Sequence, residues 1–185
     1  DTMVLLQAVG ISVPQWMSLM SVDIHSVQFQ AEAAALLPGW IKSIRHTESR
    51  ADDVTYVSCH EQMIQTMRRL EHQPFEDLVL TKHLAGDLLK CYYVTSDEPF
   101  LHWFYPQEVG YSKFGTAERH NSDLMRIPFP IALLEAVAQG IANALGLQVF
   151  GFDAIVSPQS AGVSLPCLSV IDVNDWPSFG ICRPQ

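Results

Sequence analysis

A change of hydrophobic periodicity at Gly146 constrains the fold of this chain more than any other feature of its sequence. Before it, apolar residues recur at spacings of three and four over 131–145, which predicts an amphipathic helix that the glycine ends. After it, the apolar segments 148–156 and 168–174 have the length and composition of strands. We therefore expect the C-terminal third to form a helix followed by two strands.

Helices and strands are expected to alternate along the rest of the 185 residues as well. A helix over 27–37 is stopped by Pro38, and the spacing of Ser58 and Glu61 is typical of a capping box that begins a second helix. The expected strands cover residues 40–44, 54–57, 78–80, 88–94 and 100–105, the last two as a hairpin. This mixture predicts an α+β fold, which we divide into an N-terminal lobe, 1–80, and a C-terminal lobe, 81–185.

Composition argues against several classes of partner. Eleven Lys and Arg stand against 20 Asp and Glu, so the net charge is −9 and broad binding to nucleic acid is not expected. The sequence contains no apolar run of membrane-spanning length and no secretory signal, so we expect a cytoplasmic protein with no membrane partner. The four cysteines form no CxxC pair, and we expect them to be small core residues.

Three oxygen-bearing side chains stand out near the C-terminal end. Asp153 is the only charge in its strand, and Asp172 and Asn174 are two residues apart in the next one. Residues i and i+2 share one face of a strand, about 7 Å apart, so Ile171 and Val173 should face the core. If the strands pair, these oxygens converge as a candidate Mg²⁺ site. The alternative is that Asp172 and Asn174 serve a turn and that Asp153 caps a bulge.

Two lysines interrupt apolar strands in a similar way. Lys42 shares a face with Trp40, and Lys90 lies among apolar neighbours. A lysine is rarely buried without an anionic partner, and two ammonium groups with a carboxylate-bound magnesium would neutralise a triphosphate. Each lysine could also occupy an exposed position on an edge strand.

Together these segments resemble the ATP-grasp fold. The stretches 150–153 and 170–179 are similar to the magnesium-binding end of that family, closest to its inositol-trisphosphate kinase branch and to ligases that add glutamate to a protein C-terminus. The resemblance covers roughly residues 10–180 and implies two α+β lobes with ATP between them. It does not extend to the separate front lobe of most members. Segment 43–51 also lacks the glycines of the usual phosphate-covering loop.

The resemblance implies a role for each candidate residue. Lys42 and Lys90 would contact phosphate, the segment of Lys82, His83 and Leu84 would bind adenine at the hinge, and the metal ligands would be Asp153, Asp172 and Asn174.

The implied function is a Mg-ATP-dependent ligase that activates a small-molecule or peptide carboxylate as an acylphosphate for attack by an amine. A kinase of the inositol-phosphate type and a non-catalytic ATP-binding module remain open alternatives. Acceptor contacts are expected from 111–114 and 119–121, although these residues could equally form a solvated loop.

Overall fold

The computed structural model describes residues 2–19, 22–43, 54–70, 78–108, 124–158 and 166–175. The expected acceptor residues 111–114 and 119–121, and most of segment 43–51, lie outside these ranges. The elements are α1 Thr2–Ala8, β1 Trp16–Ser18, α2 Val27–Leu36, β2 Gly39–Ser43, β3 Val54–Val57, α3 His60–Arg69, β4 Leu78–Lys82, β5 Asp87–Val94, β6 Phe100–Phe104, α4 Ile131–Leu145, β7 Val149–Ser157 and β8 Cys167–Asn174. The expected α+β class is confirmed.

The described chain divides into two compact units. Pro14–His83 forms one, called here the β1–β4 unit. Asp1–Val13 and the described residues from Leu84 onwards form the other, the β5–β8 unit. Every strand and helix expected from the sequence is present to within two residues, whereas α1 and β1 were not expected.

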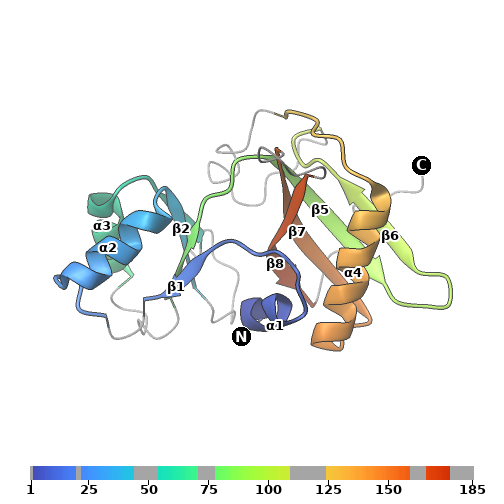
Figure 1. Ribbon diagram of the computed structural model, residues 1–185, viewed down its shortest axis with the longest axis horizontal. Helices are drawn as coiled ribbons and strands as arrows, with labels where there is room; N and C mark the ends of the chain where they lie inside the picture. The colour runs from blue at the N-terminus through green and yellow to red at the C-terminus, as the bar shows by residue number, and fades with distance from the viewer. Residues whose placement is uncertain are drawn as a thin grey trace. The chain divides into compact units, whose positions relative to one another are not determined.

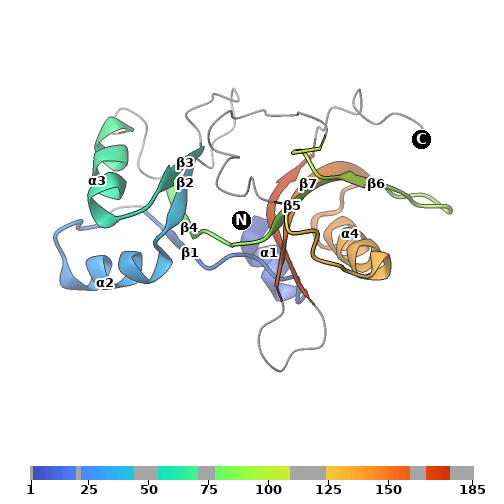
Figure 2. The same ribbon diagram turned by 90° about the horizontal axis from the view of Figure 1, so that it is seen from above.

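An antiparallel sheet in the order β1-β4-β2-β3 forms the β1–β4 unit, with α2 and α3 beside it (Figures 1 and 2). The two helices supply Phe29, Met63 and Met67 to a core that they share with Ile41 and Leu80 of the sheet. This arrangement covers one face of the sheet, and alternation along the strands turns Trp40 and Lys42 to the other face.

The start of α3 differs from the expected capping box. Its N-cap residue is Cys59, and the Ser58 hydroxyl and N–H both donate to Oε1 of Gln62 at 2.9 Å. The expected capping box of Ser58 and Glu61 is therefore wrong by one position, because the side chain that bonds to Ser58 is that of Gln62.

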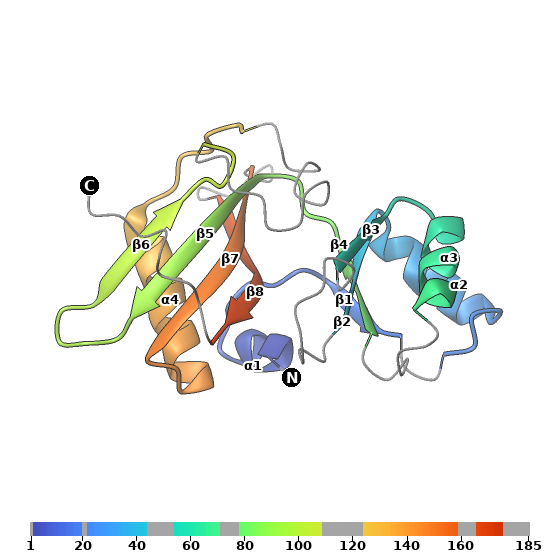
Figure 3. The same ribbon diagram turned by 180° about the vertical axis from the view of Figure 1, so that it is seen from behind.

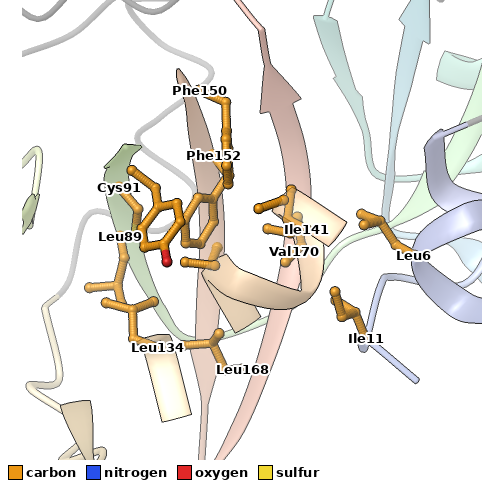
Figure 4. Packing of buried hydrophobic residues seen from close by; sticks show 14 of the residues in the cluster. Leu6, Ile11, Leu89, Cys91, Leu134, Ile141, Phe150, Phe152, Leu168 and Val170 are labelled. Carbon is orange, nitrogen blue, oxygen red and sulfur yellow. The ribbon is translucent and has the colours of Figure 1, made fainter. Parts of the chain in front are cut away.

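The β5–β8 unit is built on an antiparallel sheet in the order β6-β5-β7-β8, with α4 against one face (Figure 3). Its core joins α4 to alternate residues of the strands, and Figure 4 shows Leu89, Leu134, Phe152 and Val170 in this layer. The opposite face of the sheet therefore carries the intervening residues of β5 and β7.

Two glycines shape α4. Gly146 follows the helix with φ of 66°, a conformation that glycine adopts readily, so the expected helix end is confirmed. Gly140 lies inside the helix, where an added Cβ would be 3.1 Å from Cδ1 of Ile11. The missing side chain thus lets the segment after α1 approach α4, and Leu6 and Ile11 enter the same core (Figure 4).

The cysteines are less uniform than expected. Cys91 is buried in the core, whereas Cys59 and Cys167 are exposed, so the expectation of core residues is wrong for these two. Cys182 lies outside the described ranges. Within the part of the chain that the structure describes, none of the helices combines the length and apolar character needed to cross a bilayer.

Candidate functional site

Strand register brings three of the candidate residues into one row. Asp153 of β7 lies directly opposite Lys90 of β5 on one side and Asp172 of β8 on the other. Asn174 follows two residues later, opposite Gly151. Directly opposed residues in an antiparallel sheet point to the same face, so these side chains share the face that α4 does not cover.

A β-bulge decides that Asp172 faces this side. The pairing steps from Asp153 and Asp172 to Ala154 and Val170, which makes Ile171 an extra residue in β8. With unbroken alternation, Asp172 would share the face of Val170, which is fully buried in the core. The extra residue reverses the alternation, so Asp172 and Val170 lie on opposite faces. Val173 packs on the core as expected, whereas Ile171 is the half-buried bulge residue.

Lys90 and Asp153 form an ion pair within the row. Nζ of Lys90 donates to Oδ2 of Asp153 at 2.8 Å, and the two side chains are 8% and 25% exposed. The expectation that a lysine in an apolar strand needs an anionic partner is confirmed at this position. Lys90 lies on an interior strand of the sheet, so the alternative of an exposed edge position does not apply to it.

The donor set fits a hard divalent cation. Two carboxylates on adjacent strands repel each other, and a cation between them relieves that repulsion. The Lys90 ammonium binds one of the two carboxylates, that of Asp153. No group of three His, Cys, Asp or Glu that could hold a metal occurs among the described residues. Mg²⁺ is commonly held by one or two carboxylates with water and phosphate, so the chemistry of Asp153, Asp172 and Asn174 is compatible with that ion.

Aromatic rings extend the same face toward the edge strand β6. Tyr92 and Phe104 are stacked, with ring centroids 6.3 Å apart, and His102 lies 6.0 Å from Phe104. Tyr92 is two residues from Lys90 on β5, and Phe104 is opposite Lys90 on β6. These rings were not among the residues expected at the site, although Phe100, His102 and Phe104 alternate along β6 and so share one face of the strand.

In the β1–β4 unit, Lys42 lies on the interior strand β2 with valines directly opposite. Val54 faces it from β3 and Val79 from β4, and its side chain is half-buried. Lys42 and Trp40 share the face that α2 and α3 do not cover, as expected.

Three rings cluster at the end of β4. The indole N–H of Trp40 donates to Nδ1 of His83 at 3.1 Å, and Tyr56 packs edge-on against both rings. The backbone N–H of Lys82 donates to the Gln15 carbonyl at 2.8 Å, and that of His83 to the Pro38 carbonyl at 2.9 Å. Both N–H groups are therefore already bonded within the protein. The groups of this segment that remain for the expected contact with adenine are its carbonyls and the N–H of Leu84.

Asp87, the first residue of β5, is a buried acidic residue that the sequence did not single out. Its carboxylate oxygens accept hydrogen bonds from the N–H groups of Met125 and Ile127, both at 2.6 Å, and the residue is fully buried. Arg126, between these two donors, has φ of 52° and pairs with Glu108. Asp87 therefore holds the segment before α4 in a conformation that non-glycine residues seldom adopt.

Burial also affects Cys91, the neighbour of Lys90 on the opposite face of β5. Desolvation by burial, and then the negative charge of Asp153, raise the pKa of its thiol well above the ordinary value of 9.0. Cys91 is thus kept as a neutral thiol within the core.

Solved structures provide the comparison with known proteins. A D-alanine–D-alanine ligase from Bacillus anthracis in complex with ATP matches with a TM-score of 0.62 and 18% identity, over 99% of this chain and 54% of the ligase. An N5-carboxyaminoimidazole synthetase from Staphylococcus aureus in complex with ADP matches at 0.61 and 13%, over 95% and 43%. The ATP-grasp ligase PsnB, in complex with a minimal precursor, Mg and ADP, matches at 0.57 and 15%, over 96% and 49%.

The likeness is one of fold. This chain spans about half the length of the structures that it matches. No protein-family model and no curated protein matches the sequence. The matches nevertheless cover nearly all of this chain, as the sequence resemblance implied. The chain has the ATP-grasp fold, the fold of the ligases to which it is similar.

Proposed function

We propose that this chain binds Mg-ATP and acts as a carboxylate–amine ligase of the ATP-grasp type. The observation that carries the proposal is the row of Lys90, Asp153 and Asp172 on the face of the β5–β8 sheet that α4 does not cover, with Asn174 two positions along. Ligases with the same fold support the reaction class, and their complexes with ATP or ADP support the nucleotide.

Each residue of the proposed site would have its own role in binding Mg-ATP. Asp153, Asp172 and Asn174 would hold Mg²⁺, which neutralises phosphate charge when bound. Lys42 and Lys90 would supply further positive charge to the phosphates, because each is a cation on the face of a sheet that helices leave uncovered. The segment of Lys82, His83 and Leu84 would bind the adenine edge through backbone groups.

The proposed reaction proceeds in two transfers. A carboxylate oxygen of the acceptor attacks the γ-phosphorus of ATP, the bond to the bridging oxygen breaks, and ADP leaves. The acylphosphate is then attacked at its carbonyl carbon by an amine, phosphate leaves with the bonding electron pair, and the nitrogen loses a proton to give an amide. Positioning and charge neutralisation provide the catalysis, so no side-chain nucleophile is needed.

Calorimetric titration with Mg-ATP tests the site directly. We expect micromolar binding that requires Mg²⁺ and that weakens tenfold or more, about 1.4 kcal/mol, in Asp172→Ala and in Asn174→Ala. Asp97→Ala is the matched control, because it removes an exposed carboxylate from the loop between β5 and β6. Equal weakening in the control, or no binding by the wild-type chain at millimolar ATP, would refute the assignment.

Product analysis separates the reaction classes once binding is established. A ligase releases ADP and forms an amide only when carboxylate and amine acceptors are both supplied. A kinase transfers phosphate to an alcohol without any amine, and a binding module leaves ATP intact.

A further inference from the structure

We infer that Lys90 is a positioning residue that competes with a divalent cation for Asp153. The inference rests on the metal assignment of the proposed function and adds a role for the lysine that phosphate binding does not require. Without the cation, Lys90 would hold the Asp153 carboxylate in place. Binding of the cation would displace the Lys90 ammonium from that carboxylate.

The Lys90 ammonium lies against one oxygen of the Asp153 carboxylate. Nζ of Lys90 lies 2.8 Å from Oδ2 of Asp153, and only 8% of the lysine side chain is exposed. Asp172 lies directly opposite Asp153 on the far side from Lys90. The row formed by these three residues thus carries one positive and two negative charges.

A divalent cation and an ammonium make conflicting demands on the same carboxylate. Mg²⁺ binds oxygen at about 2.0–2.1 Å, and a second cation bonded to that oxygen would lie close enough for strong repulsion. Lysine has a flexible four-carbon stem, so the ammonium can turn away while the stem remains among apolar neighbours. The anionic groups of a bound nucleotide would then attract the released ammonium.

Binding of Mn²⁺ alone, followed by the electron paramagnetic resonance signal of the free ion, tests the competition without nucleotide or turnover. We expect Lys90→Met to bind Mn²⁺ about tenfold more tightly than the wild-type chain, because the competing charge is gone. Lys90→Gln keeps a neutral donor to Asp153 and should behave similarly, which protects the test if the methionine variant folds poorly. Equal or weaker binding in a folded Lys90 variant would overturn the inference.

Arg126→Gln is the charge-matched control. It removes one positive charge from the same unit, at a residue whose carboxylate partner is Glu108, not Asp153. We expect its affinity for Mn²⁺ to change less than about twofold, since exposed charges are screened. An equal gain in Arg126→Gln would mean that the net charge of the unit, and not the Lys90–Asp153 pair, sets the affinity, and would contradict the competition.

A second substitution separates failure of the inference from failure of the proposed function. If wild-type and Lys90→Met proteins bind Mn²⁺ equally and Asp172→Ala weakens both, the metal site stands and the competition is wrong. If Asp172→Ala has no effect in either background, or neither protein binds millimolar Mn²⁺, the metal assignment itself is wrong and the inference falls with it.

Discussion

The two sheets use the same plan and differ in the surroundings of one lysine. In each, helices cover one face, and an interior strand presents a lysine with aromatic neighbours on the other. Lys42 has valines opposite it on both neighbouring strands, whereas Lys90 has Asp153 opposite and bonded to it. The described strand pairs of the β1–β4 sheet also keep an even register, while the β5–β8 sheet has a bulge beside Asp153.

This difference shows that one sequence feature can have two different surroundings in the folded chain. A lysine within an apolar strand looks alike at both positions, and the pairing of strands decides which residues lie directly opposite it. In the proposed function, Lys42 would offer its charge to the phosphates of ATP. Lys90 belongs to a charged row with Asp153 and Asp172, so the metal ligands that we propose all lie in the β5–β8 unit.

The largest expected effect tests whether the two cores are separate. Leu89→Ala and Leu80→Ala each remove a fully buried side chain, one from each core, and each should cost about 3 kcal/mol. Hydrogen exchange should accelerate mainly in the unit that carries the substitution. Equal acceleration in both units for either variant would show that they unfold as one body.

The next effect concerns the row itself. Asp153→Ala leaves the buried Lys90 ammonium without its carboxylate and should lower the free energy of unfolding in urea by about 2 kcal/mol. This is less than for a fully buried pair, because Asp153 is partly exposed and its repulsion with Asp172 is removed. Asp172→Ala, at an exposed position of the same row, should change stability by less than about 0.5 kcal/mol. Similar losses for both variants would argue against a stabilising Lys90–Asp153 pair.

A third comparison concerns side chains that accept hydrogen bonds from backbone N–H groups. The acceptor is the Asp87 carboxylate in the β5–β8 unit and the Ser26 hydroxyl in the β1–β4 unit. Asp87→Asn keeps an oxygen acceptor for only one of the two N–H groups, those of Met125 and Ile127, and places an NH2 group against the other, so it should cost about 2 kcal/mol. Ser26→Ala removes the hydroxyl that accepts from the Phe29 N–H at the start of α2, and should cost about 1 kcal/mol. Urea denaturation of both variants checks the order, and a smaller loss for Asp87→Asn would contradict the role of its charge.

The smallest effect appears in cysteine reactivity. Burial raises the pKa of Cys91, so alkylation by iodoacetamide should label Cys59 and Cys167 in the folded protein and leave Cys91 unlabelled. The folded state keeps the Cys91 proton to higher pH than the unfolded state does. The contribution of the Cys91 thiol to the free energy of unfolding is therefore fully present below pH 9 and is lost as pH rises further. This part of the pH dependence should be absent in Cys91→Ala. Mass spectrometry of labelled peptides checks the first part, and labelling of Cys91 in folded protein would contradict its burial.

Much of the fold could be predicted because its signals are local. The spacing over 131–145 and the glycine after it specify α4, and Phe100–Phe104 pairs with β5 as the short connection between them suggests. The cap of α3 was misplaced because Glu61 and Gln62 both suit a capping box by residue type, and the structure pairs Ser58 with Gln62. The packing of α1 and Ile11 on α4 was not predicted, since the close approach of Ile11 to Gly140 joins segments that are far apart in the sequence.

The sequence by itself determined which residues are chemically unusual: two lysines, two aspartates and an asparagine within apolar strands. Only the tertiary structure decided which of them meet. Strand register is a property of two segments together, and one extra residue, Ile171, reverses the face on which Asp172 lies relative to Val170. Local periodicity cannot reveal such an insertion, because the bulge is defined by the partner strand and is held in place by the packing of Val170 and Phe152 against the core.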